Sequence, residues 1–129
     1  QAAFLRVKLR HMDADNGRRQ AIARRYREEI KHPAIKLPAV RDGEASHVWH
    51  LFVIRVPNRD AFQKQLADQG VHTAVHYPIP PHRQEAYVKQ LGHLQFPLTE
   101  GIHREVVSLP ISPVMSDEAV SYVIDQLNR

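Results

Sequence analysis

The sequence contains no cysteine and no long apolar run. The absence of cysteine excludes disulfide bonds, thiolate catalysis, cysteine-ligated zinc and iron–sulfur clusters. No stretch approaches the roughly 20 apolar residues that a membrane-spanning helix needs, and the first residues lack the basic and then apolar pattern of a secretory signal. We therefore expect a cytoplasmic protein with no membrane partner, whose chemistry uses side chains other than cysteine.

A length of 129 residues, with 43% hydrophobic and 25% charged residues, is typical of one soluble domain with one core. The chain begins QAAFLRVKLRHMD, so apolar residues recur at helical spacing from the start, without an initiator methionine, a capping residue or a polar lead-in. This beginning favours a segment of a longer protein.

The net charge of +4 comes from the first 36 residues, and the remainder is slightly acidic. Apolar residues in this basic part recur every three or four positions, which predicts a helix over 1–32. Gly17 lies beside an interruption of the apolar pattern, so we expect one long kinked helix or two abutting helices, with the bend or break near Gly17. Pro33 disfavours helical geometry in the preceding residue and ends the helix near His32.

Clustered arginines in this helix raise the hypothesis of nucleic-acid binding. At 100° per residue they point in several directions, whereas a helix that reads a groove gathers its cations on one face. The pattern therefore favours a solvated surface, with Arg19 on the apolar side and in need of a carboxylate or carbonyl partner. The cluster consists of Arg18, Arg19, Arg24, Arg25 and Arg27.

The rest of the chain alternates between strand and helix patterns, which predicts an α+β or α/β fold with a small three- to four-stranded sheet covered by helices. The run HVWHLFVIRV is apolar on both faces and predicts a central strand. Gly70 follows one helix in the position that favours a left-handed residue, and Ser116 precedes another as its cap. The predicted strands are 47–56, 71–77 and 106–111, and the predicted helices are 60–69, 84–91, 97–104 and 116–127.

Nine histidines raise the hypothesis of a metal site. On a strand, His72 and His76 share a face but stand about 13 Å apart, too far for one ion to bridge. His47 and His50 point to opposite faces. The spacing, the absence of cysteine and the absence of an HExxH motif disfavour metal binding.

The segment from His76 to His82 combines two imidazoles and a phenol with three prolines, at the end of a predicted strand. A stiff loop on a strand end is a favoured place for binding residues, because the scaffold fixes their position. Imidazole and phenol groups suit phosphate or hydroxyl oxygens, and the Tyr77 ring offers a flat face to a sugar or base. The residues alone leave two interpretations open: a binding loop, or a proline-shaped turn with solvated histidines.

Four stretches resemble the C-terminal part of the sugar-nucleotide aminotransferases, the DegT/StrS-type members of the fold-type I pyridoxal-phosphate (PLP) enzymes. They follow the family's order over the whole chain. YPIPPH, with HVWHLFVIR before it, is most similar to members that aminate a keto group on a nucleotide-linked 6-deoxyhexose. The stretches are QAAFLRVKL, HVWHLFVIRVPNRDAFQKQL, HYPIPPHRQEAY and VVSLPISPVMSDEAVSYVI.

The resemblance implies a parent enzyme in which a lysine holds PLP as a Schiff base and an amino acid, glutamate for instance, supplies nitrogen to a keto-sugar nucleotide. In this family the lysine lies in a large N-terminal domain, so no catalytic residue is expected here and the chain alone is expected to be inactive and without bound cofactor. None of the five lysines lies in a cofactor-lysine motif. They are Lys8, Lys31, Lys36, Lys64 and Lys89.

The resemblance further implies that residues 1–32 are an interdomain helix leading to the missing PLP domain, and that 33–129 form the small domain of an aspartate-aminotransferase-like fold. His76, Tyr77 and His82 are the implied substrate-binding residues, and the parent is expected to be a homodimer. Arg55 is a candidate for binding the donor carboxylate, although a surface ion pair is favoured.

Two alternatives remain open at this point: a stand-alone nucleotide-sugar-binding module, and a basic protein that binds nucleic acid through its first helix.

Overall fold

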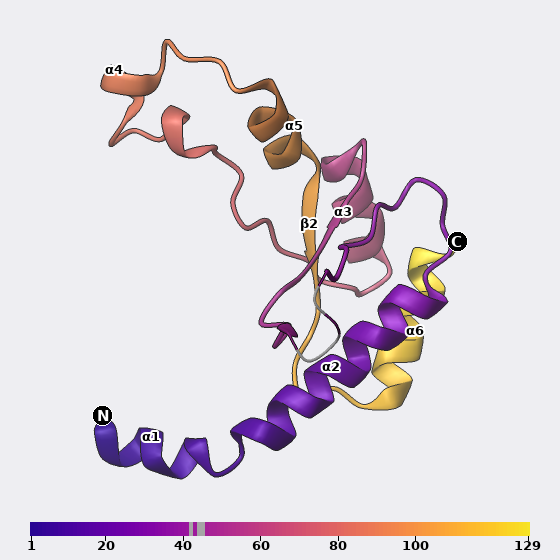
Figure 1. Ribbon diagram of the computed structural model, residues 1–129. Helices are drawn as coiled ribbons and strands as arrows, with labels where there is room; N and C mark the ends of the chain where they lie inside the picture. The colour runs from indigo at the N-terminus through magenta and orange to yellow at the C-terminus, as the bar shows by residue number, and fades with distance from the viewer. Residues whose placement is uncertain (42, 44–45) are drawn as a thin grey trace.

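The computed structural model describes residues 1–41, 43 and 46–129. A two-stranded sheet lies between helices, and a long segment carrying two short helical turns stands away from it (Figure 1). The elements are α1 (Ala2–Leu9), α2 (Met12–Glu29), β1 (Phe52–Arg55), α3 (Arg59–Asp68), the 3₁₀ turn η2 (Pro81–Arg83), α4 (Val88–Leu91), α5 (Pro97–Glu105), β2 (Val106–Leu109) and α6 (Asp117–Leu127).

The N-terminal part forms two helices, but the break is not near Gly17 as the sequence pattern predicted. The chain leaves α1 at Arg10 and begins α2 after His11, while Gly17 lies inside α2. Asp13 and Asp15 occupy the first turn of α2, where negative charge is stabilised by the helix dipole, and these two residues mark the true start.

The two N-terminal helices, which the sequence pattern predicted as one helical region over 1–32, differ in burial. No residue of α1 is buried, whereas α2 buries Ile22, Ala23 and Tyr26 completely. The last turn also ends earlier than predicted, at Glu29, because Ile30 adopts an extended conformation and closes the helix with a backbone bond to Tyr26.

The sheet pairs β1 and β2 antiparallel, with Phe52 opposite Leu109 and Arg55 opposite Val106. An isolated bridge joins Lys36 to Arg55 of β1 at one edge of the sheet, and another joins Ala74 to Ser108 of β2 at the other edge. The layer is therefore four segments wide, but only two of the three to four predicted strands form as regular strands.

Two predicted strands are much shorter than the apolar patterns suggested. Before β1, Trp49 has a left-handed backbone with φ of 51° and its N–H bonds the ring of His47, so this turn precludes an extended run. In 71–77 only Ala74 pairs with the sheet. The apolar pattern correctly placed Phe52, Ile54 and Val56 in the core, but Val48 is 52% exposed, and the pattern did not predict where the backbone pairs.

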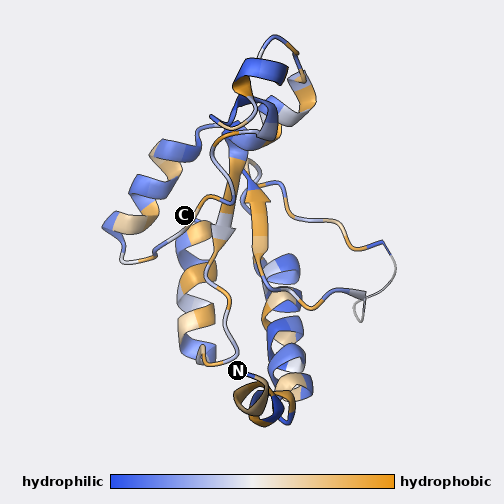
Figure 2. Ribbon diagram, turned by 90° about the vertical axis from the view of Figure 1, so that its left-hand side faces the viewer, coloured by the Kyte–Doolittle hydropathy of each residue, from blue (hydrophilic) through white to orange (hydrophobic). Residues whose placement is uncertain are grey.

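The core lies between the sheet, α2, α3 and α6, and the strands form the most hydrophobic part of the ribbon in Figure 2. Three aromatic rings fill its centre: Phe52 packs 5.1 Å from Tyr26 and 5.2 Å from Trp49 between ring centroids. The Tyr26 hydroxyl donates to the carbonyl of Pro110 at 2.8 Å, and burial raises the pKa of this phenol. Burial of these large rings supplies much of the drive for folding.

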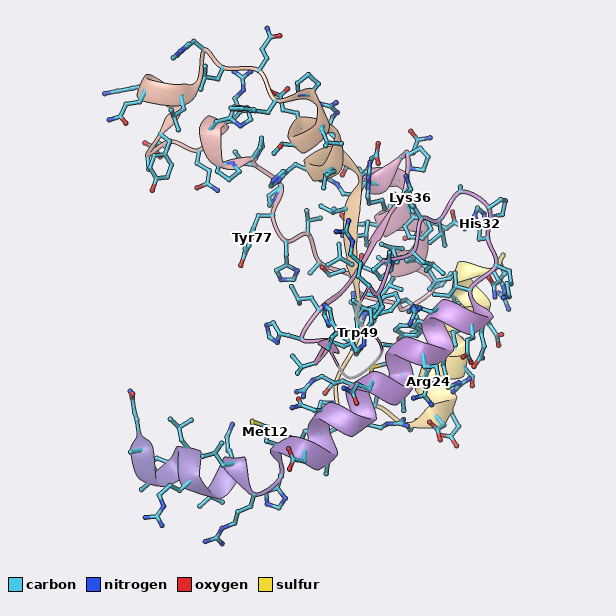
Figure 3. The ribbon with its side chains drawn as sticks, in the orientation of Figure 1. Met12, Arg24, His32, Lys36, Trp49 and Tyr77 are labelled. Atoms are coloured by element: carbon cyan, nitrogen blue, oxygen red, sulfur yellow. The ribbon has the colours of Figure 1, made fainter. Side chains whose placement is uncertain are left out.

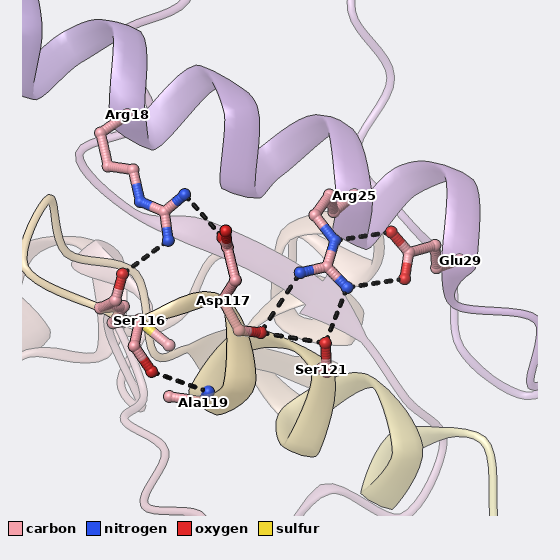
Figure 4. Close-up of polar contacts among 8 residues, drawn as sticks. Arg18, Arg25, Glu29, Ser116, Asp117, Ala119 and Ser121 are labelled. Atoms are coloured by element: carbon pink, nitrogen blue, oxygen red, sulfur yellow. Dashed lines mark hydrogen bonds and ion pairs between the residues drawn. The ribbon is translucent and has the colours of Figure 1, made fainter.

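Polar contacts from α2 complete its packing on α6 (Figure 4). Arg18 donates to the Met115 carbonyl at 2.6 Å and pairs with Asp117 at 2.8 Å. Arg25 bonds Glu29 through two nitrogens and also reaches Ser121 at 3.0 Å. We call these contacts the α2–α6 seam.

Arg19 is half-buried and has a carbonyl partner, as the sequence predicted, but the contact is long. That side chain has a long 3.4 Å bond to the amide oxygen of Asn16, whereas its neighbour Arg18 makes the carbonyl and carboxylate contacts. Two members of the basic cluster thus serve the packing of helices.

Three of the remaining helices, α3, α5 and α6, match their predicted positions to within one residue at each end. Gly70 has φ of 75° after α3, in the left-handed region as predicted, and the Ser116 side chain accepts the Ala119 N–H at the start of α6. The predicted helix 84–91 is reduced to the single turn α4. With α5 and α6 in place, the α+β class is confirmed.

Candidate functional site

His76, the first predicted site residue, lies beside Ser108 at the edge of the sheet. Ser108 of β2 exchanges both backbone hydrogen bonds with Ala74, and its side chain lies 2.9 Å from Nδ1 of His76. Because Nδ1 is engaged, Nε2 is the imidazole nitrogen that remains for a ligand. If Ser108 donates to Nδ1, then Nε2 carries the proton, and in the other tautomer Nε2 accepts.

Tyr77 lies next along the chain and presents its ring to solvent. Its side chain is 66% exposed and projects away from the ribbon (Figure 3). The peptide bond between His76 and Tyr77 is cis, and the two rings meet edge to face with centroids 5.5 Å apart. An exposed phenol ring beside a fixed imidazole gives a stacking face and a hydrogen-bonding edge together.

Helix α5 holds the backbone at Tyr77. Nδ1 of His103 in α5 donates to the carbonyl of Tyr77 over 2.6 Å, and since a carbonyl only accepts, the proton of this imidazole lies on Nδ1. The carbonyl of His103 in turn accepts from Arg59 at 2.8 Å. The chain direction at Tyr77 is therefore fixed from α5.

His82, the third predicted site residue, lies inside the protein rather than at its surface. Only 4% of His82 is exposed, its Nε2 is 3.0 Å from Oε1 of Glu100, and its ring packs on Phe96 with centroids 4.9 Å apart. A carboxylate only accepts hydrogen bonds, so Nε2 is the donor. The structure thus places Tyr77 at the surface beside His76 and buries His82 at the far end of the loop that they begin.

A cavity of about 300 Å³ adjoins His76. Its lining brings His50, which the sequence assigned to another strand, together with His72 and His76. No group of three His, Asp or Glu residues within the described ranges is arranged to hold a metal ion. The lining includes His50, His72, Thr73, Ala74, His76 and Ser108.

Arg55 forms the ion pair that the sequence favoured. It meets Glu105 at 2.7 and 2.9 Å through two nitrogens, at the junction of α5 and β2. The guanidinium is thereby engaged inside the domain.

Sequence reasoning missed the three residues that fix the loop, which are Glu100, His103 and Ser108. A signal for the first two was present: they are three positions apart on a predicted helix, hence on one face, and that helix leads directly into the strand that carries Ser108. Their partners lie 18 to 32 residues away, and local patterns do not reveal such pairs.

Comparison with known proteins defines the class. The profile of the DegT/DnrJ/EryC1/StrS aminotransferase family matches residues 1–128, and the chain belongs to this family. Its fold agrees with this assignment: a solved structure of DesV from S. venezuelae in complex with a ketimine intermediate superposes with a TM-score of 0.91 at 38% identity, over 99% of this chain and 35% of that one.

Two curated relatives show how similar the sequence is. The chain is 57% identical to dTDP-3-amino-3,6-dideoxy-alpha-D-galactopyranose transaminase of Aneurinibacillus thermoaerophilus, over 100% of this chain and 35% of that protein. It is 40% identical to dTDP-3-amino-3,4,6-trideoxy-alpha-D-glucose transaminase of Streptomyces venezuelae, over 100% and 34%. The chain thus spans about a third of the length of these relatives. Within the described ranges, no helix is long and apolar enough to cross a membrane.

Proposed function

We propose that this chain is the C-terminal part of a PLP-dependent aminotransferase that moves an amino group from an amino acid, glutamate in the first instance, to a keto-sugar nucleotide. The observation that carries the proposal is the family match over residues 1–128 together with 57% identity to a transaminase named for an amino sugar linked to dTDP. The name of this relative supports a keto group on a nucleotide-linked 6-deoxyhexose as the proposed acceptor.

We propose a division of the chain in which α1 leaves the domain while α2 packs into its core. Residues 1–32 are the proposed interdomain helix and 33–129 the small domain. An eight-residue helix is marginal in water by itself, yet α1 has apolar side chains and no buried residue. Its apolar residues are the surface that we assign to the N-terminal PLP domain, in a cytoplasmic homodimer. They are Phe4, Leu5, Val7 and Leu9, each more than half exposed, followed by Met12.

The residues of this chain do not fit the cofactor. The described lysines lie on α1 (Lys8), after α2 (Lys31), at the sheet edge (Lys36), on α3 (Lys64) and on α4 (Lys89), and none lines the cavity beside His76. When bound in the parent, PLP carries the nitrogen between the two substrates. We assign the holding of PLP to the N-terminal domain and no chemical step to this chain.

The proposed part of this chain is substrate binding. With Nδ1 occupied by Ser108, Nε2 of His76 is oriented to meet a phosphate or hydroxyl oxygen. The Tyr77 ring covers the sugar or base, which removes apolar area from water on binding. His82 contributes indirectly, by holding the far end of the loop through Glu100.

Isotope transfer tests the proposal. The full-length protein is incubated with PLP, glutamate labelled with ¹⁵N and a dTDP-linked 3-keto-6-deoxyhexose, and mass spectrometry follows the sugar nucleotide. We expect ¹⁵N in the sugar nucleotide, and none when the 129-residue chain replaces the full-length protein. A second incubation adds pyruvate; label that appears in alanine but never in the sugar nucleotide would overturn the assignment of the acceptor.

A further inference from the structure

The segment 78–96, which we call the arm, stands apart from the core (Figure 1). Its two helical turns, η2 and α4, pack on each other, and many of its apolar side chains are exposed. The arm therefore lacks a buried apolar face that would fix its position by packing. The exposed apolar residues are Ile79, Tyr87, Val88, Leu91 and Phe96.

One carboxylate ties the arm to the rest of the domain. Within the described ranges, every side-chain hydrogen bond or ion pair that links the arm to other segments ends on Glu100. Oε1 of Glu100 accepts from Nε2 of His82 at 3.0 Å and from the Phe96 N–H at 3.2 Å, and it lies 3.6 Å from a guanidinium nitrogen of Arg83.

These bonds keep the carboxylate ionised. The Phe96 N–H is the largest influence and the hydrogen bond from His82 the next, and together they hold the pKa of Glu100 below its usual value. An ionised acceptor makes shorter and stronger hydrogen bonds than a neutral one, so Glu100 is suited to hold a buried imidazole.

The geometry transmits this restraint to the binding residues. Between Tyr77 and His82 the chain contains Pro78, Pro80 and Pro81, whose rings fix φ, so the loop is a stiff connector. Its two ends are both held by α5: His103 binds the Tyr77 carbonyl and Glu100 binds His82. When the Glu100 contact is lost, the His82 end is freed, and the stiff loop carries that movement back to Tyr77, where the single bond from His103 remains.

We propose that Glu100 is a positioning residue for the sugar-nucleotide site: its carboxylate holds His82, and through the proline loop it sets the place of the Tyr77 ring. This inference rests on the proposed function for the substrate, whereas its structural part is independent of it.

Steady-state kinetics of the full-length enzyme test the inference. We expect Glu100→Ala to raise KM for the keto-sugar nucleotide about tenfold and to leave KM for glutamate unchanged, since one charge-assisted hydrogen bond set is lost. Glu100→Gln keeps an oxygen that accepts from His82 and Phe96, so it should restore most of the affinity. Asp68→Asn, which breaks the exposed pair of Lys64 and Asp68, is the matched control and should have no effect.

A double-mutant cycle separates positioning from general damage. If Glu100 acts through His82, then Glu100→Ala and His82→Ala should each raise KM for the keto-sugar nucleotide. The KM of the double variant should then exceed that of the more impaired single variant by no more than about twofold. An unchanged KM in Glu100→Ala, or equal losses for both substrates, would overturn the proposal.

Hydrogen exchange distinguishes this failure from failure of the proposed function. In the full-length protein without substrate, Glu100→Ala should speed amide exchange in the peptide that covers 77–96, whereas Asp68→Asn should not. Faster exchange in an enzyme that never aminates a sugar nucleotide would refute the proposed acceptor and support the structural tie. Unchanged exchange would refute the tie itself.

Discussion

The body and the arm of this domain are held together in different ways. In the body, which comprises α2, α3, the two strands and α6, large rings such as Phe52 and Tyr26 are fully buried. In the arm, apolar side chains remain exposed and Glu100 supplies the side-chain contacts that link it to the rest of the described structure. Burial is non-directional and stabilises the fold, whereas directed bonds fix a position. The loop that carries Tyr77 connects the body to the arm.

A matched pair of phenylalanine truncations should show this difference most strongly. Phe52→Ala removes a fully buried ring and should lower the free energy of unfolding by about 3–5 kcal/mol. Phe96→Ala removes a ring that is 44% exposed and touches His82, and should cost about 1 kcal/mol. Urea denaturation of the two variants provides the measurement, and similar losses would contradict the contrast between body and arm.

The Arg25–Glu29 ion pair within α2, whose arginine also reaches Ser121 of α6, makes a smaller contribution to stability that depends on pH. The hydrogen bond from Arg25 is the main cause that lowers the pKa of Glu29. A lowered carboxyl pKa stabilises the folded state above the unfolded value near 4.5, and this stabilisation is lost as the pH falls through the lower folded value.

Glu29→Gln should therefore cost no more than about 1 kcal/mol at neutral pH, because both partners are partly exposed. Its difference from the wild type should disappear in acid. Unfolding by urea at a series of pH values measures this, with Asp68→Asn as the exposed control; a difference that persists well below pH 4 would argue against the pair.

Local patterns predicted the parts of the fold whose causes are local. The left-handed Gly70 and the Ser116 cap each depend on neighbouring residues, and both were found from the sequence. The lengths of β1 and of the segment around Ala74 depend on which distant backbone pairs with them, so apolar runs overstated both.

The same distinction between local and distant causes applies to the candidate site. The resemblance to known aminotransferases drew attention to His76, Tyr77 and His82, but the sequence did not distinguish an exposed ring from a buried one. That difference comes from Glu100 of α5, 18 positions away, and from the ring of Phe96 just before that helix, which together enclose His82. Chemistry was predictable from residue type, whereas burial required the tertiary structure.

The central claim is that the surface beside His76 binds the sugar nucleotide, and Tyr77→Ala in the full-length enzyme tests it most directly. We expect KM for the keto-sugar nucleotide to rise about tenfold while KM for glutamate is unchanged, since an exposed ring loses its contact only with that substrate. Tyr122→Ala, which removes an equally large ring from α6, should leave both values as in the wild type. An unchanged sugar-nucleotide KM in Tyr77→Ala would contradict the account.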